Sequence, residues 1–164
     1  MTPLQAVKRA RSAIGVPTVY MLGRGGTNPD FKEPGGSAHR CDCSGAIAWF
    51  LGVNRKTDHP FYAKYNGGWL ETSAITRDAT LPHVGLFDTV PWEEARLGDL
   101  LVYGDKGGHQ GHVGMVSEIG PDWRPALVIH CSAGNYRRTG DAIQETSPAV
   151  FLSKGIIARY AGFV

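Results

Sequence analysis

The sequence predicts an α+β fold, because helical segments come first along the chain and strands come after them. Residues 2–14 and 43–52 carry helix-capping residues and an apolar face, whereas residues 100–103, 112–119 and 126–132 have the apolar or alternating pattern of strands. The chain has 164 residues, of which 42% are hydrophobic and 20% charged, as is ordinary for a globular protein. We therefore expect residues 1–164 to form a single domain, with N-terminal helices packed on a central antiparallel sheet.

The first helix is predicted from its capping residues and its apolar face. Thr2 can cap the helix, Pro3 suits its first turn, and Leu4, Val7 and Ile14 fall on one face. The segment is basic but lacks the apolar core of a secretory signal, so we expect a protein made in the cytoplasm without a signal peptide. A mitochondrial transit peptide is the competing interpretation.

Bulk composition argues against two classes of partner. The formal net charge is only +2, which gives no strong attraction to nucleic acid. No run of about 18 apolar residues is present, so no membrane span is predicted.

The three cysteines, Cys41, Cys43 and Cys131, raise the question of a disulfide, a metal site or a nucleophile. Their odd number argues against a disulfide framework, and a bond between Cys41 and Cys43 would be strained. Zinc could be assembled from these cysteines and His130, but the C-x-C and H-C spacings are poor for a tetrahedral site. The spacing therefore disfavours both a disulfide framework and a zinc site at these residues.

The second helix begins at the second of these cysteines. Asp42 is placed to cap the helix, Cys43 is then its first residue, and Gly52 can end it. A thiol at a helix N-terminus feels the positive end of the helix dipole, so we expect a lowered pKa for Cys43. Ser44 and Gly45 leave room for a substrate. The alternative is that Cys43 is only a small buried hydrophobic residue.

A thiol nucleophile needs a base, and the predicted strands supply one. A short helical turn at 92–96 and a bend at Gly98 precede strand 100–103, which is joined to strand 112–119 by a hairpin loop at 106–111. On the second strand His112, Gly114 and Val116 point to one face. Gly114 beside His112 leaves the kind of space that a cleft needs.

The third strand places a second histidine near the first. Leu127, Ile129 and Cys131 lie on one face of strand 126–132 and His130 on the other. Cys131 is therefore expected in the core. We predict that Cys43 attacks, that His112 removes its proton, and that His130 accepts a hydrogen bond from the other ring nitrogen of His112. Either histidine could instead be a satisfied core residue.

Four motifs in this order, DCSG at a helix start, LGDLLVY, GHVGMV and VIHCSAG, resemble the NlpC-type cell-wall peptidases, which are papain-like cysteine hydrolases. The resemblance covers residues 13–135 and implies a papain-like fold with Cys43, His112 and His130 as catalytic residues. It also implies hydrolysis of peptidoglycan stem peptides, typically between D-γ-glutamate and a diamino acid such as meso-diaminopimelate, without a cofactor.

The chain departs from the family pattern at two places. Tyr20, in VYMLGRGG, matches the family's cleft tyrosine only loosely. The linker at 54–90 is longer than usual and rich in aromatic residues, so it is either a surface excursion or a wall of the substrate groove that sets specificity through segment 59–70. Arg24, Arg40 and Lys64 are cationic candidates near the cleft. The residues expected to contact substrate are Tyr20, Asp42, Ser44, Tyr65 and Trp69.

The setting and the exact reaction stay open at this point. A wall substrate without a signal peptide fits a phage lysin or tail protein, a toxin delivered by a secretion apparatus and held by an immunity protein, or a cytoplasmic recycling enzyme. Another thiol acyl-transfer enzyme on the same fold, such as an acyltransferase or deamidase, is the main alternative function. A non-catalytic metal-binding module is the other.

Overall fold

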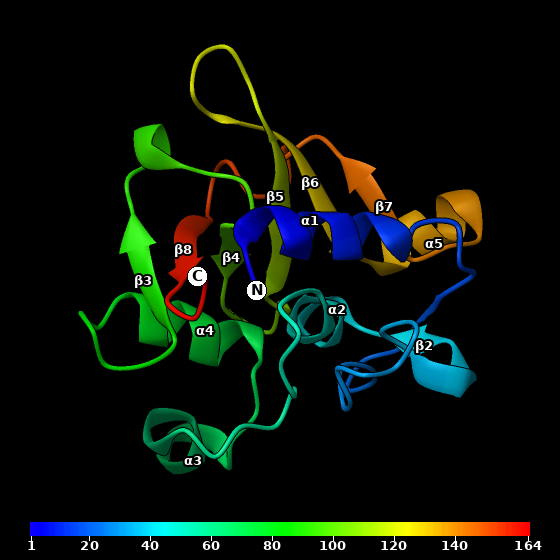
Figure 1. The fold of residues 1–164 in the computed structure, drawn as a ribbon, viewed down its shortest axis with the longest axis horizontal. Helices are drawn as coiled ribbons and strands as arrows, with labels where there is room; N and C mark the ends of the chain where they lie inside the picture. Colours follow the sequence, from blue (N-terminus) through cyan, green and yellow to red (C-terminus); the bar gives the residue numbers. More distant parts are fainter.

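The computed structural model describes residues 1–164 and contains one six-stranded antiparallel sheet with helices packed on it (Figure 1). The strand order is β3-β8-β4-β5-β6-β7, and a separate parallel pair, β1-β2, lies beside it. The α+β class predicted from the sequence is confirmed.

The helices are α1 (Pro3–Ser12), α2 (Cys43–Phe50), α3 (Pro60–Asn66), α4 (Thr72–Ala79) and α5 (Ala133–Thr139), with the 3₁₀ turns η1 (Gly36–Ala38) and η2 (Trp92–Glu94). The strands are β1 (Val19–Tyr20), β2 (Arg40–Cys41), β3 (Phe87–Val90), β4 (Leu100–Tyr103), β5 (His112–Ile119), β6 (Pro125–Cys131), β7 (Ile143–Thr146) and β8 (Ile156–Tyr160).

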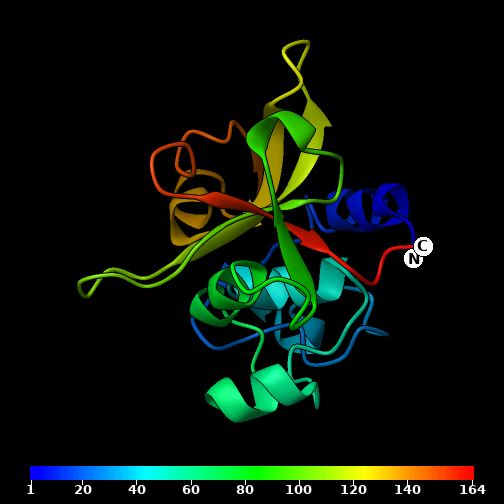
Figure 2. The same ribbon diagram turned by 90° about the vertical axis from the view of Figure 1, so that its left-hand side faces the viewer.

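The sheet alternates as the sequence predicts, and its two faces belong to different clusters. Val113 and Met115 of β5 pack with α2 in the main core, whereas Val116 of the same strand belongs to a smaller cluster on the other face. Likewise Cys131 of β6 is in the main core and Val128 is in the smaller cluster. Helices α1, α2 and α4 cover the first face, as Figures 1 and 2 show.

Helix α1 begins as predicted, with a capping box between Thr2 and Gln5 and Pro3 in the first turn. The predicted apolar face is only partly the packed face, because Leu4 is 51% exposed and Ile14 lies beyond the end of the helix. The buried residues are instead Ala6, Val7 and Ala10. Small side chains at these positions let α1 lie close against α2, and a leucine on that face would hold the two helices apart.

The linker at 54–90 is part of the fold and not a surface excursion. It forms α3, α4 and the edge strand β3, and it places Tyr62, Leu70 and Ile75 in the main core. The buried carboxylate of Asp78 joins these elements, because it accepts hydrogen bonds from the Tyr62 hydroxyl at 2.6 Å and from the amide of Leu86 at 2.8 Å. Deleting residues 59–70 would therefore remove core side chains together with any substrate contact.

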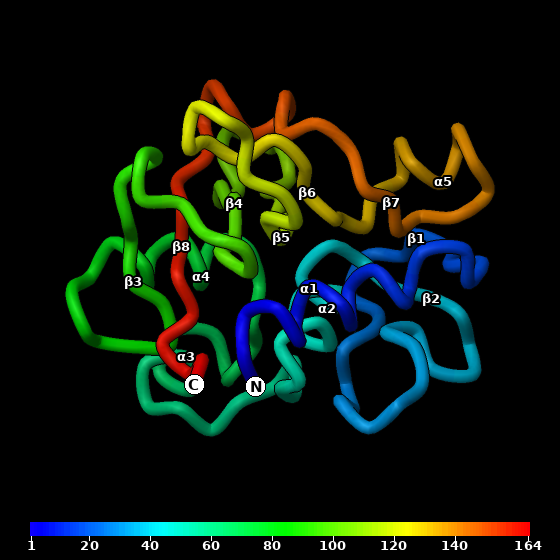
Figure 3. Tube along the Cα trace, turned by 45° about the horizontal axis from the view of Figure 1, so that its top comes forward, coloured from blue at the N-terminus to red at the C-terminus, as the bar shows by residue number.

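The two ends of the chain meet at the surface. The amide of Val164 donates to the carbonyl of Met1 at 3.2 Å, and Figure 3 shows the termini side by side at the start of α1 and the end of the segment that follows β8. No helix combines the length and the apolar character needed to cross a lipid bilayer.

Replacing Tyr62 by Phe should destabilise the protein by about 2 kcal/mol, because it removes a hydrogen bond to a buried carboxylate. The free energy of unfolding in urea measures this loss. Tyr136→Phe is the matched control, since Tyr136 is 38% exposed and its hydroxyl makes no hydrogen bond within the chain, and it should change stability by less than about 0.5 kcal/mol. Equal effects of the two substitutions would contradict the role given to Asp78.

Candidate active site

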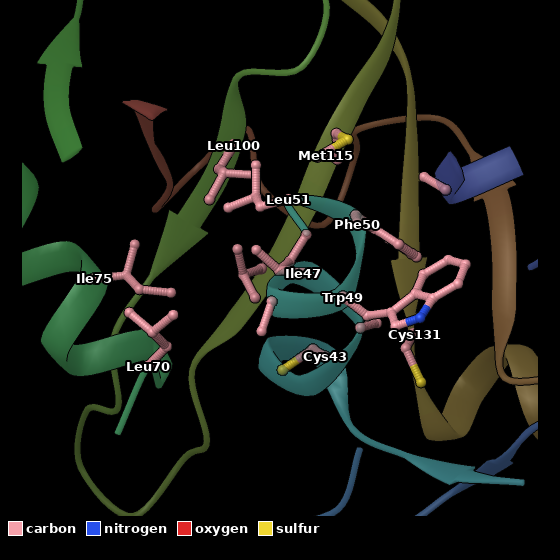
Figure 4. Packing of buried hydrophobic residues seen from close by; sticks show 14 of the residues in the cluster. Cys43, Ile47, Trp49, Phe50, Leu51, Leu70, Ile75, Leu100, Met115 and Cys131 are labelled. Carbon is pink, nitrogen blue, oxygen red and sulfur yellow. The ribbon is translucent and has the colours of Figure 1, made fainter. Parts of the chain in front are cut away.

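Cys43 is the first residue of α2, as the sequence predicts, and lies where the helix start meets the sheet (Figure 4). Ile47, one turn further along the helix, and Leu51 belong to the same buried cluster as Leu100 of β4 and Met115 of β5, so this cluster holds the helix against the sheet. Cys43 is only 5% exposed, and a cavity of about 190 Å³ lies beside it. The helix is thus buried along its length and opens to solvent only at its N-terminal end.

The carboxylate of Asp42 organises this end of the helix. One oxygen, Oδ1, accepts from the Gly45 amide at 2.8 Å, which is the N-cap bond predicted from the sequence. The other, Oδ2, accepts from the Gly23 amide at 2.6 Å and from Nη2 of Arg55 at 2.7 Å. The same Arg55 nitrogen donates to the Ser44 hydroxyl at 2.9 Å. Asp42, Ser44 and Arg55 therefore form one buried polar cluster in the wall of the cavity.

The prediction of a lowered thiol pKa is wrong. Burial, together with a smaller contribution from the nearby carboxylate of Asp42, raises the pKa of Cys43 to about 12. The backbone of Val113 and of Ser44, together with the charge of Arg55, opposes this rise without cancelling it. A neutral thiol is consequently the resting form of Cys43, and its reactivity depends on a base.

His112 and His130 are hydrogen-bonded to each other, as the sequence predicts. Nε2 of His112 lies 2.7 Å from Nδ1 of His130. Nε2 of His130 in turn lies 2.9 Å from the hydroxyl of Thr146, which projects from β7. Thr146 is opposite Val128 in the strand register, so its side chain is a diagonal neighbour of His130 on the same face. A chain of three side chains thus runs across β5, β6 and β7.

The donor and acceptor in each of these hydrogen bonds follow from Thr146, the last residue of the series. The Thr146 hydroxyl donates its only proton to the carbonyl of Ser147 at 3.1 Å, so it accepts from Nε2–H of His130. Nδ1 of His130 then carries no proton and accepts from Nε2–H of His112. The remaining ring nitrogen of His112, Nδ1, is left with a free lone pair. This is the tautomer that a general base requires.

Both histidines are neutral at physiological pH. Burial lowers the pKa of His112 to about 3, with smaller contributions from its interaction with His130 and from the charge of Lys154. Burial also lowers the pKa of His130 to about 4, with a contribution from Arg138.

The face of His112 that the sequence assigns to a cleft is filled by an aromatic ring. Phe151, which is fully buried, stacks on His112 with ring centroids 5.2 Å apart and an angle of 8° between the planes. A Cβ atom on Gly114 would lie 3.1 Å from Cβ of His130 and 3.2 Å from the Phe151 ring. Gly114 therefore makes room for His130 and Phe151 and not for a substrate.

The Cys43 thiol lies near the backbone of β5, the strand that carries His112. The backbone of Val113, the residue that follows His112 in β5, lies close enough to the Cys43 thiol to oppose the rise of its pKa. No hydrogen bond joins the thiol to the His112 ring itself in the free protein.

The other residues expected to contact substrate divide between two places. Tyr20 is half-buried and lines the cavity beside Cys43, and burial raises its pKa. Tyr65 and Trp69 do not line that cavity; Tyr65 lines a neighbouring groove, and Trp69 lies under the guanidinium of Arg55 at 5.4 Å. The three cationic candidates, Arg24, Arg40 and Lys64, line neither hollow.

The remaining cysteines lie in the core. Cys41 and Cys131 are fully buried free thiols, and Cys131 Sγ donates to the carbonyl of Cys41 at 3.4 Å. His130 and Cys131 point to opposite faces of the sheet, as predicted. No group of three or more His, Cys, Asp or Glu side chains is placed to hold a metal ion.

The sequence analysis missed two residues that the structure brings into the site. Arg55 stands beside Lys56 just after a helix, and only its pairing with Asp42 in the folded chain distinguishes it from a surface arginine. Thr146 lies on a strand that the analysis did not predict. The alternation of β7 could have placed a hydroxyl beside β6 once that strand was recognised.

No protein-family model matches the chain, and no curated protein matches it significantly in sequence.

The buried histidines should make stability depend on pH. A histidine whose pKa falls from 6.5 in the unfolded chain to about 3 or 4 in the fold contributes stability that is present above pH 6.5 and is lost as the pH falls. Between pH 7 and pH 5, each should lower the unfolding free energy by up to about 2 kcal/mol. Urea unfolding at several pH values measures this slope.

The matched variant is His112→Asn combined with His130→Asn, which removes both titrating rings. Its unfolding free energy should change much less between pH 7 and pH 5. An identical pH dependence in the two proteins would show that the rings are protonated or exposed in the fold.

Proposed function

We propose that the chain is a papain-like cysteine hydrolase of the NlpC type that cleaves peptidoglycan stem peptides. The observation that supports this most strongly is the hydrogen-bonded series Thr146–His130–His112, which leaves Nδ1 of His112 free on the strand whose next residue, Val113, approaches the Cys43 thiol through its backbone. A cysteine at a helix start, packed against an antiparallel sheet with a histidine on the adjacent strand, is also the arrangement that the family resemblance implies.

The chemistry begins from a neutral thiol and a neutral imidazole. Nδ1 of His112 takes the thiol proton as the Cys43 sulfur attacks the carbonyl carbon of the scissile amide. The positive charge that forms on His112 is shared with His130 through their hydrogen bond. His112 then gives the proton to the departing amine, and a thioester on Cys43 remains for water to hydrolyse.

The oxyanion that forms during attack needs donors that the fold has not already used. The first amides of α2 point out of the helix end, and the amide of Cys43 has no acceptor within the chain. This amide is therefore available to the oxyanion, at the positive end of the helix dipole.

The cavity beside Cys43 fits the acyl side of a short polar peptide. Its walls include the carboxylates of Asp42 and Glu71, the hydroxyls of Ser44 and Tyr20, and the guanidinium of Arg55. A stem peptide offers an amine and free carboxylates to such groups. The bond between D-γ-glutamate and meso-diaminopimelate is the target we propose, on the family resemblance.

Purified protein should cleave the tripeptide L-alanyl-γ-D-glutamyl-meso-diaminopimelate, with the products identified by mass spectrometry. Cys43→Ala should abolish cleavage and leave the fold intact, whereas Cys41→Ser and Cys131→Ala should keep most activity because their thiols are core groups. Loss of activity in Cys41→Ser equal to that in Cys43→Ala would contradict the assignment. Products carrying an added acyl acceptor would identify a transferase instead.

Variants of the two histidines and Thr146 separate the base from the groups that orient it. His112→Ala should lower kcat/KM by a factor of about 10² to 10⁴, since no other base is in place. His130→Ala should be milder, and His130→Asn should restore more activity than His130→Gln, because the Asn oxygen takes the position of Nδ1.

Thr146→Val should reduce kcat about tenfold, and Thr146→Ser should not, because only valine lacks the acceptor that orients His130. Equal activities of Thr146→Val and Thr146→Ser would remove Thr146 from the mechanism.

A further inference from the structure

A second and larger hollow opens next to the Cys43 cavity. It has a volume of about 970 Å³ and lies between α4 and the hairpin that joins β4 to β5, which Figure 2 shows projecting from the sheet. Three cations line it: Arg77 in the last turn of α4, Lys106 in the hairpin, and Lys154 in the segment before β8. We call this hollow the cationic groove.

The charges of the cationic groove are not neutralised by the protein. None of Arg77, Lys106 and Lys154 forms an ion pair with an acidic side chain. Asp105, the acidic residue in the lining, is held instead by uncharged donors, with its Oδ1 accepting from the Gly111 amide at 2.6 Å and from the Thr72 hydroxyl at 3.4 Å.

Two aromatic rings hold Arg77 and Lys154 at the walls of the cationic groove. The guanidinium of Arg77 lies 5.6 Å from the centre of the Tyr65 ring, and Nζ of Lys154 lies 4.3 Å from the centre of the Tyr103 ring. Such contacts orient a cation without neutralising it, so both groups stay available to an anion.

The cationic groove is continuous with the candidate active site. Asp105 and Gln110 line both the groove and the Cys43 cavity. Lys154 lies close enough to His112 for its charge to lower the pKa of that ring. The cationic groove therefore lies on the side of the candidate active site where His112 is found.

The leaving group of the substrate must lie on the same side of the candidate site as His112. In the proposed reaction His112 hands its proton to the departing amine, so this amine must lie next to His112. The acyl portion stays with Cys43 and its cavity, and the portion that leaves extends over Lys154 into the groove.

We propose that the cationic groove binds free carboxylates on the leaving-group portion of the substrate, an amine-bearing peptide with two or more negative charges. The inference rests on the proposed function and adds to it the part of the chain that selects the leaving group. A carboxylate seated at Lys154 also offsets the positive charge that disfavours protonation of His112. Substrate binding thus makes the base stronger when it is needed.

Binding of the amine product tests the proposal without relying on turnover. The probe is meso-diaminopimelyl-D-alanine, which has two free carboxylates, and the comparison is its diamide. In calorimetric titrations at low salt, the diacid should bind the full-length protein about tenfold more tightly than the diamide.

The groove variant combines Arg77→Gln, Lys106→Gln and Lys154→Gln, and should bind the diacid as weakly as the diamide. The control variant combines Lys8→Gln, Lys32→Gln and Arg137→Gln, which removes three exposed cations outside the groove, and should keep the wild-type preference. Equal binding of diacid and diamide, an unchanged preference in the groove variant, or an equal loss in the control variant would each overturn the proposal.

Cleavage assays then distinguish this inference from the proposed function. If a stem peptide with an amidated leaving group is cut as fast as the free acid, the hydrolase stands and the groove does not select carboxylates. If no stem peptide is cut but the diacid preference persists and depends on the groove, the carboxylate site stands and the proposed reaction fails.

Discussion

The buried carboxylate of Asp42 is the constraint on which the candidate site depends. It is 1% exposed and accepts hydrogen bonds from the helix start, from the loop at Gly23 and from Arg55, so three separate segments meet on it. A buried charge of this kind is stable only while all its partners are in place. The position of Cys43, the next residue, is consequently fixed by the loop at Gly23 and by Arg55 as well as by its own helix.

The same carboxylate determines how the thiol can react. Its negative charge adds to the effect of burial and keeps Cys43 protonated, so the positive end of the helix dipole is not enough to give a thiolate. Proton removal must then come from outside the helix. In the proposed reaction the base is His112. Its tautomer is set by the hydrogen bonds that run through His130 to Thr146, and Phe151 stacks on its ring. The reaction that we propose therefore starts from a neutral thiol and a neutral imidazole and not from a preformed ion pair.

The sequence predicts the parts of this arrangement that are local. The cap at Asp42, the helix start at Cys43 and the opposite faces of His130 and Cys131 follow from capping rules and strand alternation, and the structure has all of them. The pairing of the two histidines could also be predicted, because β5 and β6 are joined by a short hairpin.

The features that the sequence does not predict depend on long-range packing. Arg55 reaches Asp42 only in the folded chain, and the linker at 54–90 enters the core because Asp78 joins its helices to β3. The raised pKa of Cys43 also depends on long-range packing. Neither the burial of a helix end nor the balance of charges around it can be predicted from the neighbouring residues in the sequence. The role of Gly114 could not be predicted either, because the Phe151 ring for which it makes room comes from a segment far along the chain.

The protonation state and tautomer of His112 test the central claim most directly. Long-range ¹H–¹⁵N correlation spectra of ¹⁵N-histidine-labelled protein at pH 7 should show His112 and His130 as neutral rings, each with its proton on Nε2. That pattern leaves Nδ1 of His112 free to take the thiol proton. A protonated His112, or a neutral His112 with its proton on Nδ1, would contradict the account, because neither form can act as the base for Cys43.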